Sequence, residues 1–137
     1  MAVKSLYLST AGASQVAVEI RRSLASGPTR LATAQKDGEA HIRILSENRE
    51  KSILTLTGAG RVYDYLLRLR VGYQVTDAKG NALIEPAELE IRRIITYSET
   101  APLAKEAEEQ NLYHDMNLEA AQLILRRVAV MRPPARP

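Results

Sequence analysis

The sequence has 137 residues, about the size of one domain that can bury a hydrophobic core without covalent staples. It contains no cysteine, which excludes a disulfide framework, a cysteine-ligated zinc site and a thiol nucleophile, and its two histidines are too few for a closed protein-ligated metal site. The net charge is only +3, but 14 of the 19 basic residues are arginine, so an anionic partner is permitted and not required.

The first part of the chain predicts a strand followed by a short amphipathic helix. Residues Val3–Leu8 alternate in polarity, as a strand does. Ser14 is a suitable N-cap for the helix, and Gly27-Pro28 is a suitable end. The apolar residues of this helix recur at one-turn spacing, at Val16, Ile20 and Leu24.

Two alternating runs follow a polar stretch from Thr29 to Glu39. They are Ala40–Leu45 and Ser52–Thr57, joined by the charged segment Glu47–Lys51. The pattern allows either one long bent strand or a hairpin. Gly58-Ala59-Gly60 then predicts a hairpin turn and not a phosphate-binding loop, because a strand and not a helix follows the glycines.

The clearest strand signal lies between Val62 and Thr76, where the odd-numbered positions from Tyr63 to Val75 are apolar and the opposite face is polar. A turn at Asp77–Asn81 leads into a strand over Ala82–Tyr97, and Pro86 within it predicts an edge position or a bulge.

Like faces must oppose each other in this pair of strands, so paired residue numbers should sum to an even value. A turn centred near Lys79 then predicts that Leu67 lies opposite Ile91, and that Arg68 and Arg70 lie opposite Glu90 and Glu88 on the outer face. The same hairpin brings Arg61 and Tyr97 to one end of the molecule.

A long helix is predicted to open at Thr100-Ala101-Pro102 and to end before Arg132, with acidic residues early and arginines late, as the helix dipole favours. Its apolar stripe comprises Leu112, Tyr113, Met116, Ala120, Leu123, Ile124 and Val128. The fold class is therefore α/β, of the α+β kind: a two-layer sandwich with two helices on one face of a mainly antiparallel four-stranded sheet. We expect a single domain over residues 1–131 and a disordered tail, rich in Pro and Arg, over 132–137.

The sequence offers no arrangement typical of catalysis. His41 and His114-Asp115 could be read as a metal or proton-transfer set, or as the centre of a small hydrolase, but we expect two surface histidines, no metal and no enzyme activity. No cofactor is expected.

The arginines leave a nucleic-acid interface open as an interpretation. Arg68, Arg70 and Arg92 lie on a predicted sheet face, but the tyrosines needed for base stacking lie on the other, so an ion-paired, solvated face is favoured. Arg93 falls by parity among apolar residues. It must be partnered, lie at a bulge, or face a lipid-like or anionic groove.

Several motifs of the last strands and the long helix occur together in this sequence. They are Tyr63-Asp64-Tyr65, Ile91–Ser98, Leu103–Glu109 with the pattern L-A-K-x-x-E, Met116, Ala120-Ala121 and Arg126-Arg127. In these motifs the sequence resembles the LPS-assembly lipoprotein LptE family, also called rare lipoprotein B, of Gram-negative outer membranes. The similarity covers Val3 to about Val128 and is most specific from Val62 to Arg127.

This resemblance implies a protein without catalytic activity that forms a two-protein translocon with the outer-membrane barrel LptD, sits as a plug in its lumen and binds lipopolysaccharide (LPS). One of the family's basic LPS-contacting positions falls on Lys105. The other falls within Gly58–Gly60, where the nearest cation is Arg61. Arg93 is the next candidate for LPS binding.

The resemblance also implies a location at the periplasmic side of the outer membrane. The family is anchored through an acylated N-terminal cysteine, and this sequence has none, so we expect the lipid anchor to lie upstream of Met1. The alternative interpretation from the residues is a small basic cytoplasmic α+β module that binds nucleic acid or protein. The LptE resemblance favours LPS and LptD as partners, and no nucleic acid.

Overall fold

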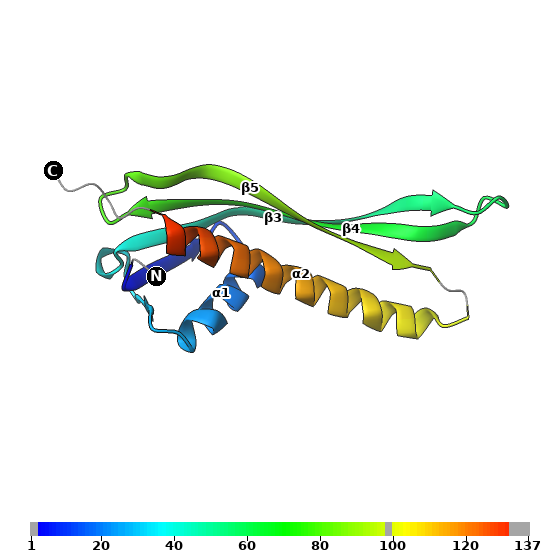
Figure 1. Ribbon diagram of the computed structural model, residues 1–137, viewed down its shortest axis with the longest axis horizontal. Coiled ribbons are helices and arrows are strands. Elements are labelled where there is room, and N and C mark those ends of the chain that lie inside the picture. Colours follow the sequence, from blue (N-terminus) through cyan, green and yellow to red (C-terminus); the bar gives the residue numbers. More distant parts are fainter. Residues whose placement is uncertain (1–2, 98–99, 132–137) are drawn as a thin grey trace.

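The computed structural model describes residues 3–97 and 100–131; the expected tail at 132–137 lies outside them. One five-stranded sheet, in the order β2-β1-β3-β4-β5, carries both helices on one of its faces (Figure 1). The elements are β1 (Ser5–Thr10), α1 (Gln15–Ala25), β2 (Arg30–Leu31), a 3₁₀ turn (Gln35–Asp37), β3 (Ala40–Leu56), β4 (Val62–Asp77), β5 (Ala82–Thr96) and α2 (Pro102–Val130).

This architecture confirms the predicted α+β class, but the sheet has five strands and not four. The additional strand, β2, is only Arg30–Leu31 and pairs in parallel with β1, which in turn pairs in parallel with β3. A two-residue strand is too short to show alternation, so the polar stretch after Thr29 gave no signal of it.

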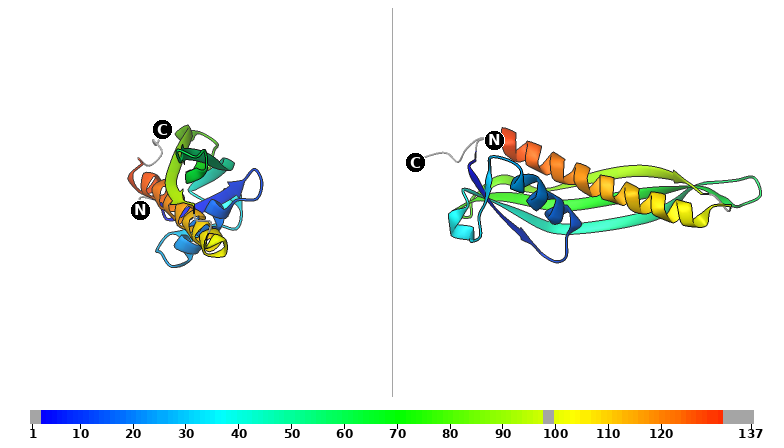
Figure 2. Two further views of the ribbon diagram at one scale, coloured as in Figure 1. Left: turned by 90° about the vertical axis from the view of Figure 1, so that its right-hand side faces the viewer. Right: turned by 90° about the horizontal axis from the view of Figure 1, so that it is seen from below.

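The segment from Ala40 to Leu56 is one long strand, which settles the alternative that the sequence left open. Only its first residues, Ala40–Ile44, pair with β1, whereas nearly its whole length pairs with β4. The sheet is therefore widest near the chain termini, which we call the proximal end, and continues as β3-β4-β5 toward the turn between β3 and β4, the distal end. Helix α1 lies at the proximal end, and α2 runs beneath the three-stranded extension (Figures 1 and 2).

A β-bulge at Leu45 divides β3 into two parts with opposite side-chain parity. Before it, Ile44 pairs with Tyr73; after it, Ser46 pairs with Gly72 and Glu47 with Val71. One extra residue in a strand moves every following side chain to the other face. The even-numbered Ile42 and Ile44 thus face the helices, but from Glu47 to Ile53 the odd-numbered residues do, until a further irregularity at Thr55.

The register predicted between β4 and β5 is correct in parity but wrong by two residues. Thr76 pairs with Ala82, as a turn centred on Lys79 requires, yet Leu69 and not Leu67 lies opposite Ile91. Likewise Arg70, and not Arg68, lies opposite Glu90, because two extra residues of β5 are accommodated between Ala82 and Ala87. Pro86 lies in this irregular stretch of an edge strand, as its missing N–H predicted.

The predicted core is confirmed, and the Ser14 cap with it. The Ser14 hydroxyl accepts a hydrogen bond from the Ala17 N–H at 2.9 Å at the start of α1. Tyr63 is an exception on the inner face of β4, because it lies at the distal end and remains 54% exposed. Core residues of β4, β5 and α2 include Leu67, Leu69, Val71, Ile91, Met116, Ala120 and Ile124, with Tyr65 and Leu123 packed against them.

Leu69→Ala should lower the free energy of unfolding by about 2–5 kcal/mol, because it empties a site where the side chain is completely buried. Chemical denaturation measures this loss. Leu103→Ala is the matched control, since Leu103 is 79% exposed and should change stability by no more than about 0.5 kcal/mol. Equal losses in the two variants would contradict the assignment of the inner face.

Candidate functional site

A groove of about 230 Å³, which we call the distal groove, opens between the sheet and the first turns of α2. The segments that form it are distant in sequence: the distal part of β3, the start of β4, the end of β5 and the N-terminal turns of α2. Its floor and walls are partly aromatic and partly charged. The lining residues are Lys51, Tyr65, Ile95, Thr96, Tyr97, Pro102, Lys105, Glu106 and Glu109.

Two lysines from different elements face this groove, and each has an acidic partner on α2. The Lys51 Nζ lies 2.7 Å from Glu109 Oε1 and 4.4 Å from the centre of the Tyr65 ring. The hydrogen bond to Glu109 raises the pKa of the Lys51 ammonium, with a smaller opposing effect of burial. The Lys105 Nζ lies 2.8 Å from Glu108 Oε2, one helical turn away. The groove is thus zwitterionic, with two cations held by neighbouring carboxylates.

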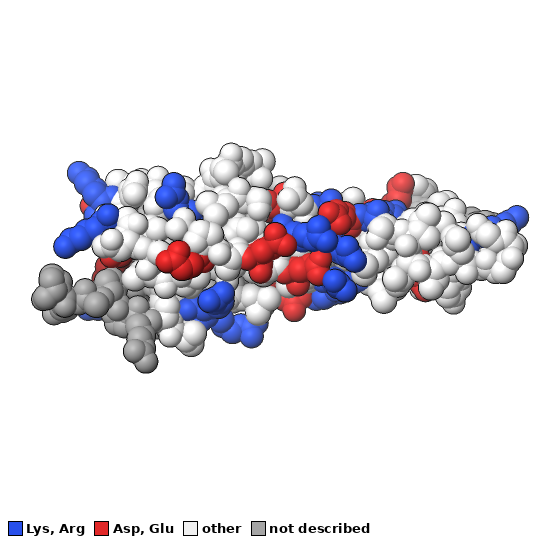
Figure 3. All heavy atoms as spheres, turned by 90° about the horizontal axis from the view of Figure 1, so that it is seen from above, with Lys and Arg blue, Asp and Glu red and all other residues white. Residues whose placement is uncertain are grey.

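The distal end of the molecule carries many exposed apolar side chains. Viewed onto the open face of the sheet, charged side chains gather over the middle of the molecule, and the distal end is mostly uncharged (Figure 3). Large apolar side chains that are exposed there are Ile53, Leu54, Leu56, Tyr63, Ile94, Tyr97 and Leu103. An amphipathic partner could contact the groove and this surface together.

Of the three LPS-binding residues predicted from the sequence, only Lys105 lines the distal groove. Arg61 lies at the same end of the molecule, where the Tyr97 N–H donates to the Tyr63 carbonyl at 2.8 Å. It belongs to the turn between β3 and β4, and its N–H donates to Thr57 Oγ1 at 3.1 Å. Arg61 and Lys105 therefore lie at the same end of the molecule, as predicted, but only Lys105 lines the groove.

Arg93 lies away from this groove. Its guanidinium forms an ion pair with Glu119 of α2 and also donates to the Arg92 carbonyl at 2.7 Å. Glu119 follows Lys105 by 14 residues, which corresponds to about 21 Å along the helix. Of the three alternatives that parity left open for Arg93, the structure therefore shows the partnered one.

The outer face of the sheet carries an ion-paired network, as the sequence favoured. Glu90 lies 3.1 Å from Arg70 and 2.7 Å from Arg92, and Glu50 lies 3.1 Å from Arg70. Hydrogen bonds from Arg92 and Arg70 hold the pKa of Glu90 below its usual value. Arg68 is more distant, at 3.9 Å from Glu50. The charged residues of this face therefore form exposed ion pairs with each other, and each such pair contributes little to stability.

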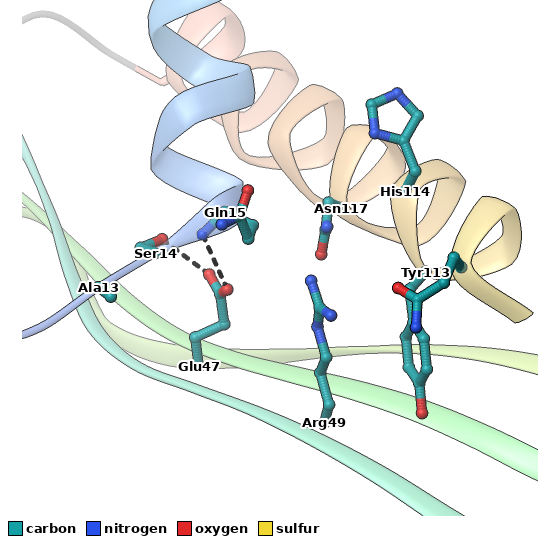
Figure 4. Close-up of a pocket in the computed structure, with 9 residues that line it drawn as sticks. Ala13, Ser14, Gln15, Glu47, Arg49, Tyr113, His114 and Asn117 are labelled. Carbon is teal, nitrogen blue, oxygen red and sulfur yellow. Dashed lines mark hydrogen bonds between the residues drawn. The ribbon is translucent and has the colours of Figure 1, made fainter.

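A second, larger hollow of about 590 Å³ lies where α1, α2 and β3 meet (Figure 4). The Glu47 carboxylate closes one side, because it accepts hydrogen bonds from Ser14 Oγ at 2.7 Å, the Gln15 N–H at 3.0 Å and the Val16 N–H at 3.2 Å. Arg49 lies over the Tyr113 ring at 4.9 Å. The carboxylate from β3 thus occupies the N-terminus of α1, where an anion is favoured.

Glu47→Ala should lower the free energy of unfolding by about 1–2 kcal/mol, because it leaves N–H groups at the start of α1 without their acceptor. Chemical denaturation measures the difference. Glu88→Ala removes an exposed carboxylate on β5 and is the matched control. If both variants are as stable as the parent, the carboxylate does not cap the helix.

The two histidines do not lie together, and the expectation that both are on the surface is wrong for one of them. His41 is buried, stacks edge-on against Tyr7, and shares a hydrogen bond of 2.7 Å between Nε2 and Ser9 Oγ. The side chain of His114 is 58% exposed. Within residues 3–97 and 100–131, no three His, Cys, Asp or Glu side chains are grouped so that they could hold a metal ion.

Burial, with a smaller contribution from Arg43, lowers the pKa of His41 below its usual value. An unfolded chain therefore binds a proton at a higher pH than the folded protein does. The stability contributed by neutral His41 is present above about pH 6.5 and is lost as the pH falls toward the folded pKa.

We therefore expect the free energy of unfolding of the parent to decrease between pH 7 and pH 5, and to decrease less in His41→Gln. Denaturation at a series of pH values measures this, with His114→Gln as the control for loss of an exposed imidazole. If His41→Gln and the parent have the same pH dependence, His41 is not the titrating group.

The sequence did not identify Lys51 as a groove residue. It stands in the charged segment Glu47–Lys51, which by its pattern alone connects two alternating runs. Lys51 pairs with the buried Leu67 across β3 and β4, and directly opposed side chains share a face, so the lysine points toward α2. Only the bulge at Leu45 reveals this, because alternation continued from Ile42 and Ile44 would place Lys51 on the outer face.

The comparisons with known proteins agree with the resemblance seen in the motifs. The model of the LptE family, described as lipopolysaccharide-assembly, matches residues 3–128. No curated protein sequence matches this chain. No helix among the described residues is both long and apolar enough to cross a membrane.

Three solved structures share the fold. An uncharacterised lipoprotein B from Nitrosomonas europaea is 31% identical, with a TM-score of 0.86 over 93% of this chain and 83% of that chain. The rare lipoprotein B from Shewanella oneidensis is 28% identical, with a TM-score of 0.79 over 91% and 93% of the two chains. A minor lipoprotein from Acinetobacter baumannii is 25% identical, with a TM-score of 0.74 over 98% and 97%.

The family match covers most of the chain and the similar folds are those of bacterial lipoproteins, so the class of protein is defined on both grounds. This chain belongs to the LptE family of lipopolysaccharide-assembly proteins.

Proposed function

We propose that this protein binds LPS through its distal end and acts with the outer-membrane barrel LptD in LPS assembly, as a plug within the barrel. Family membership supports the role in LPS assembly. The observation that carries the binding site is Lys105 in a groove surrounded by exposed apolar side chains. Binding of this kind requires no catalytic residue, cofactor or metal.

The chemistry of the distal end suits both parts of an amphipathic lipid. A lysine ammonium contacts phosphate oxygens, and charge-assisted hydrogen bonds of this type are stronger than neutral ones. Apolar contacts are offered at the same end of the molecule by Tyr65 and Tyr97, which line the groove with Lys105, and by Leu103 in the first turn of α2, which is 79% exposed. Arg61, at the same end, is the second proposed cation, and Arg93 is the next candidate.

The exposed apolar surface also supports a protein partner. Ile94 is 60% exposed on the outer face of β5, and Leu56 is 59% exposed at the end of β3. Apolar side chains at such positions are costly to leave in water, and an enclosing partner such as a barrel lumen would cover them. The lipoprotein relatives support a location at the periplasmic side of the outer membrane through an N-terminal lipid anchor.

The ion pair between Lys105 and Glu108 competes with a phosphate for the Lys105 ammonium. Contacts at helical spacing contribute only about 0.2–0.5 kcal/mol, so this partner is easily exchanged for a phosphate. The alternative of a nucleic-acid-binding module has less support, because the arginines of the outer face are engaged with Glu50 and Glu90.

Combined Lys105→Asp and Arg61→Asp substitutions should abolish LPS binding in a pull-down, because they replace both proposed cations with groups that repel phosphate. The circular dichroism spectrum and melting temperature should stay close to those of the parent, since both substitutions are near the surface.

Lys36→Asp combined with Lys79→Asp applies the same change in net charge to exposed lysines elsewhere and should leave LPS binding intact. If the folded Lys105 and Arg61 double variant retains LPS as the parent does, the site lies elsewhere, and Arg93 is tested next. Co-purification with outer-membrane barrels from native membranes tests the proposed LptD partnership.

A further inference from the structure

We propose that Lys51 is a further phosphate-binding cation of the distal groove, and that Glu109 is its resting counter-ion, which the phosphate of a bound glycolipid displaces. This inference rests on the proposed function, since it assumes that the groove receives a phosphorylated lipid. It adds Lys51, to which the sequence assigned no role. It also implies that Glu109 competes with the bound phosphate for the Lys51 ammonium.

The position of Lys51 brings it into the same groove as Lys105. Lys51 is on β3, opposite Leu67 of β4, and faces α2 after the bulge at Leu45. Lys105 is in the first turns of α2, and both residues line the distal groove. Two ammonium groups that line one groove, one from the sheet and one from the helix, can contact one phosphate or two phosphates of the same lipid.

Lys51 is charged and held in place by more than its carboxylate partner. The Lys51 Nζ lies 4.4 Å from the centre of the Tyr65 ring, within the range of a cation–π contact. The Lys51 side chain is nevertheless 43% exposed, so an anion in the groove can reach it. The aromatic contact would keep the ammonium in position after Glu109 had moved away.

Glu109 is a partner of Lys51 that a phosphate can displace. Its carboxylate lies 2.7 Å from Lys51 Nζ and lines the groove beside Glu106. An ion pair between partly exposed side chains has little net stability, whereas a phosphate offers a greater charge and more acceptor oxygens. The two acidic side chains also repel an incoming anion. Removal of the Glu109 charge should therefore strengthen binding, a gain that a purely structural ion pair would not produce.

The test measures binding of two probes in maltoside micelles by titration calorimetry: phosphorylated lipid A and the same lipid with its phosphates removed. Lys51→Gln should weaken binding of phosphorylated lipid A about five- to tenfold, and Lys51→Arg should restore most of it. Glu109→Gln should strengthen binding of this probe about three- to fivefold. Neither change should alter binding of the phosphate-free probe.

Matched controls remove the same charges at the proximal end of the sheet. Lys79→Gln changes an exposed lysine in the turn between β4 and β5, and Glu85→Gln changes an exposed carboxylate of β5. Both should bind as the parent does. Melting temperatures identify any variant that fails to fold, and the Lys51→Arg variant keeps the charge if Lys51→Gln is unstable.

The proposal is overturned if folded Lys51→Gln binds phosphorylated lipid A as tightly as the parent, or if Glu109→Gln binds no more tightly than Glu85→Gln. In either case, loss of binding in Lys105→Gln would leave the proposed function standing without Lys51. If the parent does not prefer phosphorylated lipid A to the phosphate-free lipid, the phosphate site itself is wrong, and this inference is rejected with it.

Discussion

The bulge at Leu45 is the constraint on which the rest of the structure depends. It inserts one residue into β3 relative to β4 and so exchanges the faces of the side chains that follow, from Glu47 to Ile53. As a result Glu47, Arg49 and Lys51 point toward the helices, where an unbroken strand would have placed their neighbours. Each then meets a specific partner, namely the N-terminus of α1, the Tyr113 ring and Glu109 respectively.

This exchange gives the two ends of the molecule different interiors. At the proximal end, α1 and α2 cover a wide sheet, and apolar side chains such as Ile42 and Ile44 belong to the hydrophobic core. At the distal end, α2 alone lies beneath three strands, and the interface includes ion pairs and an open groove. The distal end keeps exposed apolar surface, which suits a protein that works in LPS assembly.

Several of the arginines form ion pairs with carboxylates of the same chain. Arg68, Arg70 and Arg92 lie around Glu50 and Glu90 on the open face of the sheet, and Arg93 is paired with α2. These residues neutralise carboxylates of the same chain, so the small positive net charge does not measure its capacity for anionic partners. The proposed phosphate site depends instead on a few cations at the distal end, two of which lie beside carboxylates of α2.

The sequence by itself determined the α+β class, the apolar face of β4, the core stripe of α2, the Ser14 cap and the interruption at Pro86. These features follow from local periodicity and from the chemistry of single residues, which act over a few neighbours. It also carried the family resemblance, through motifs along the last strands and helix.

Only the tertiary structure decided the pairing of strand β2, the two-residue shift of β5, the burial of His41 and the partnership of Lys51 with Glu109. Each of these features depends on how segments distant in the sequence are aligned with each other. A bulge of a single residue changes that alignment and turns the following side chains to the other face of the sheet. Alternation along one strand fixes which residues share a face, but only pairing with the neighbouring strand decides which face that is.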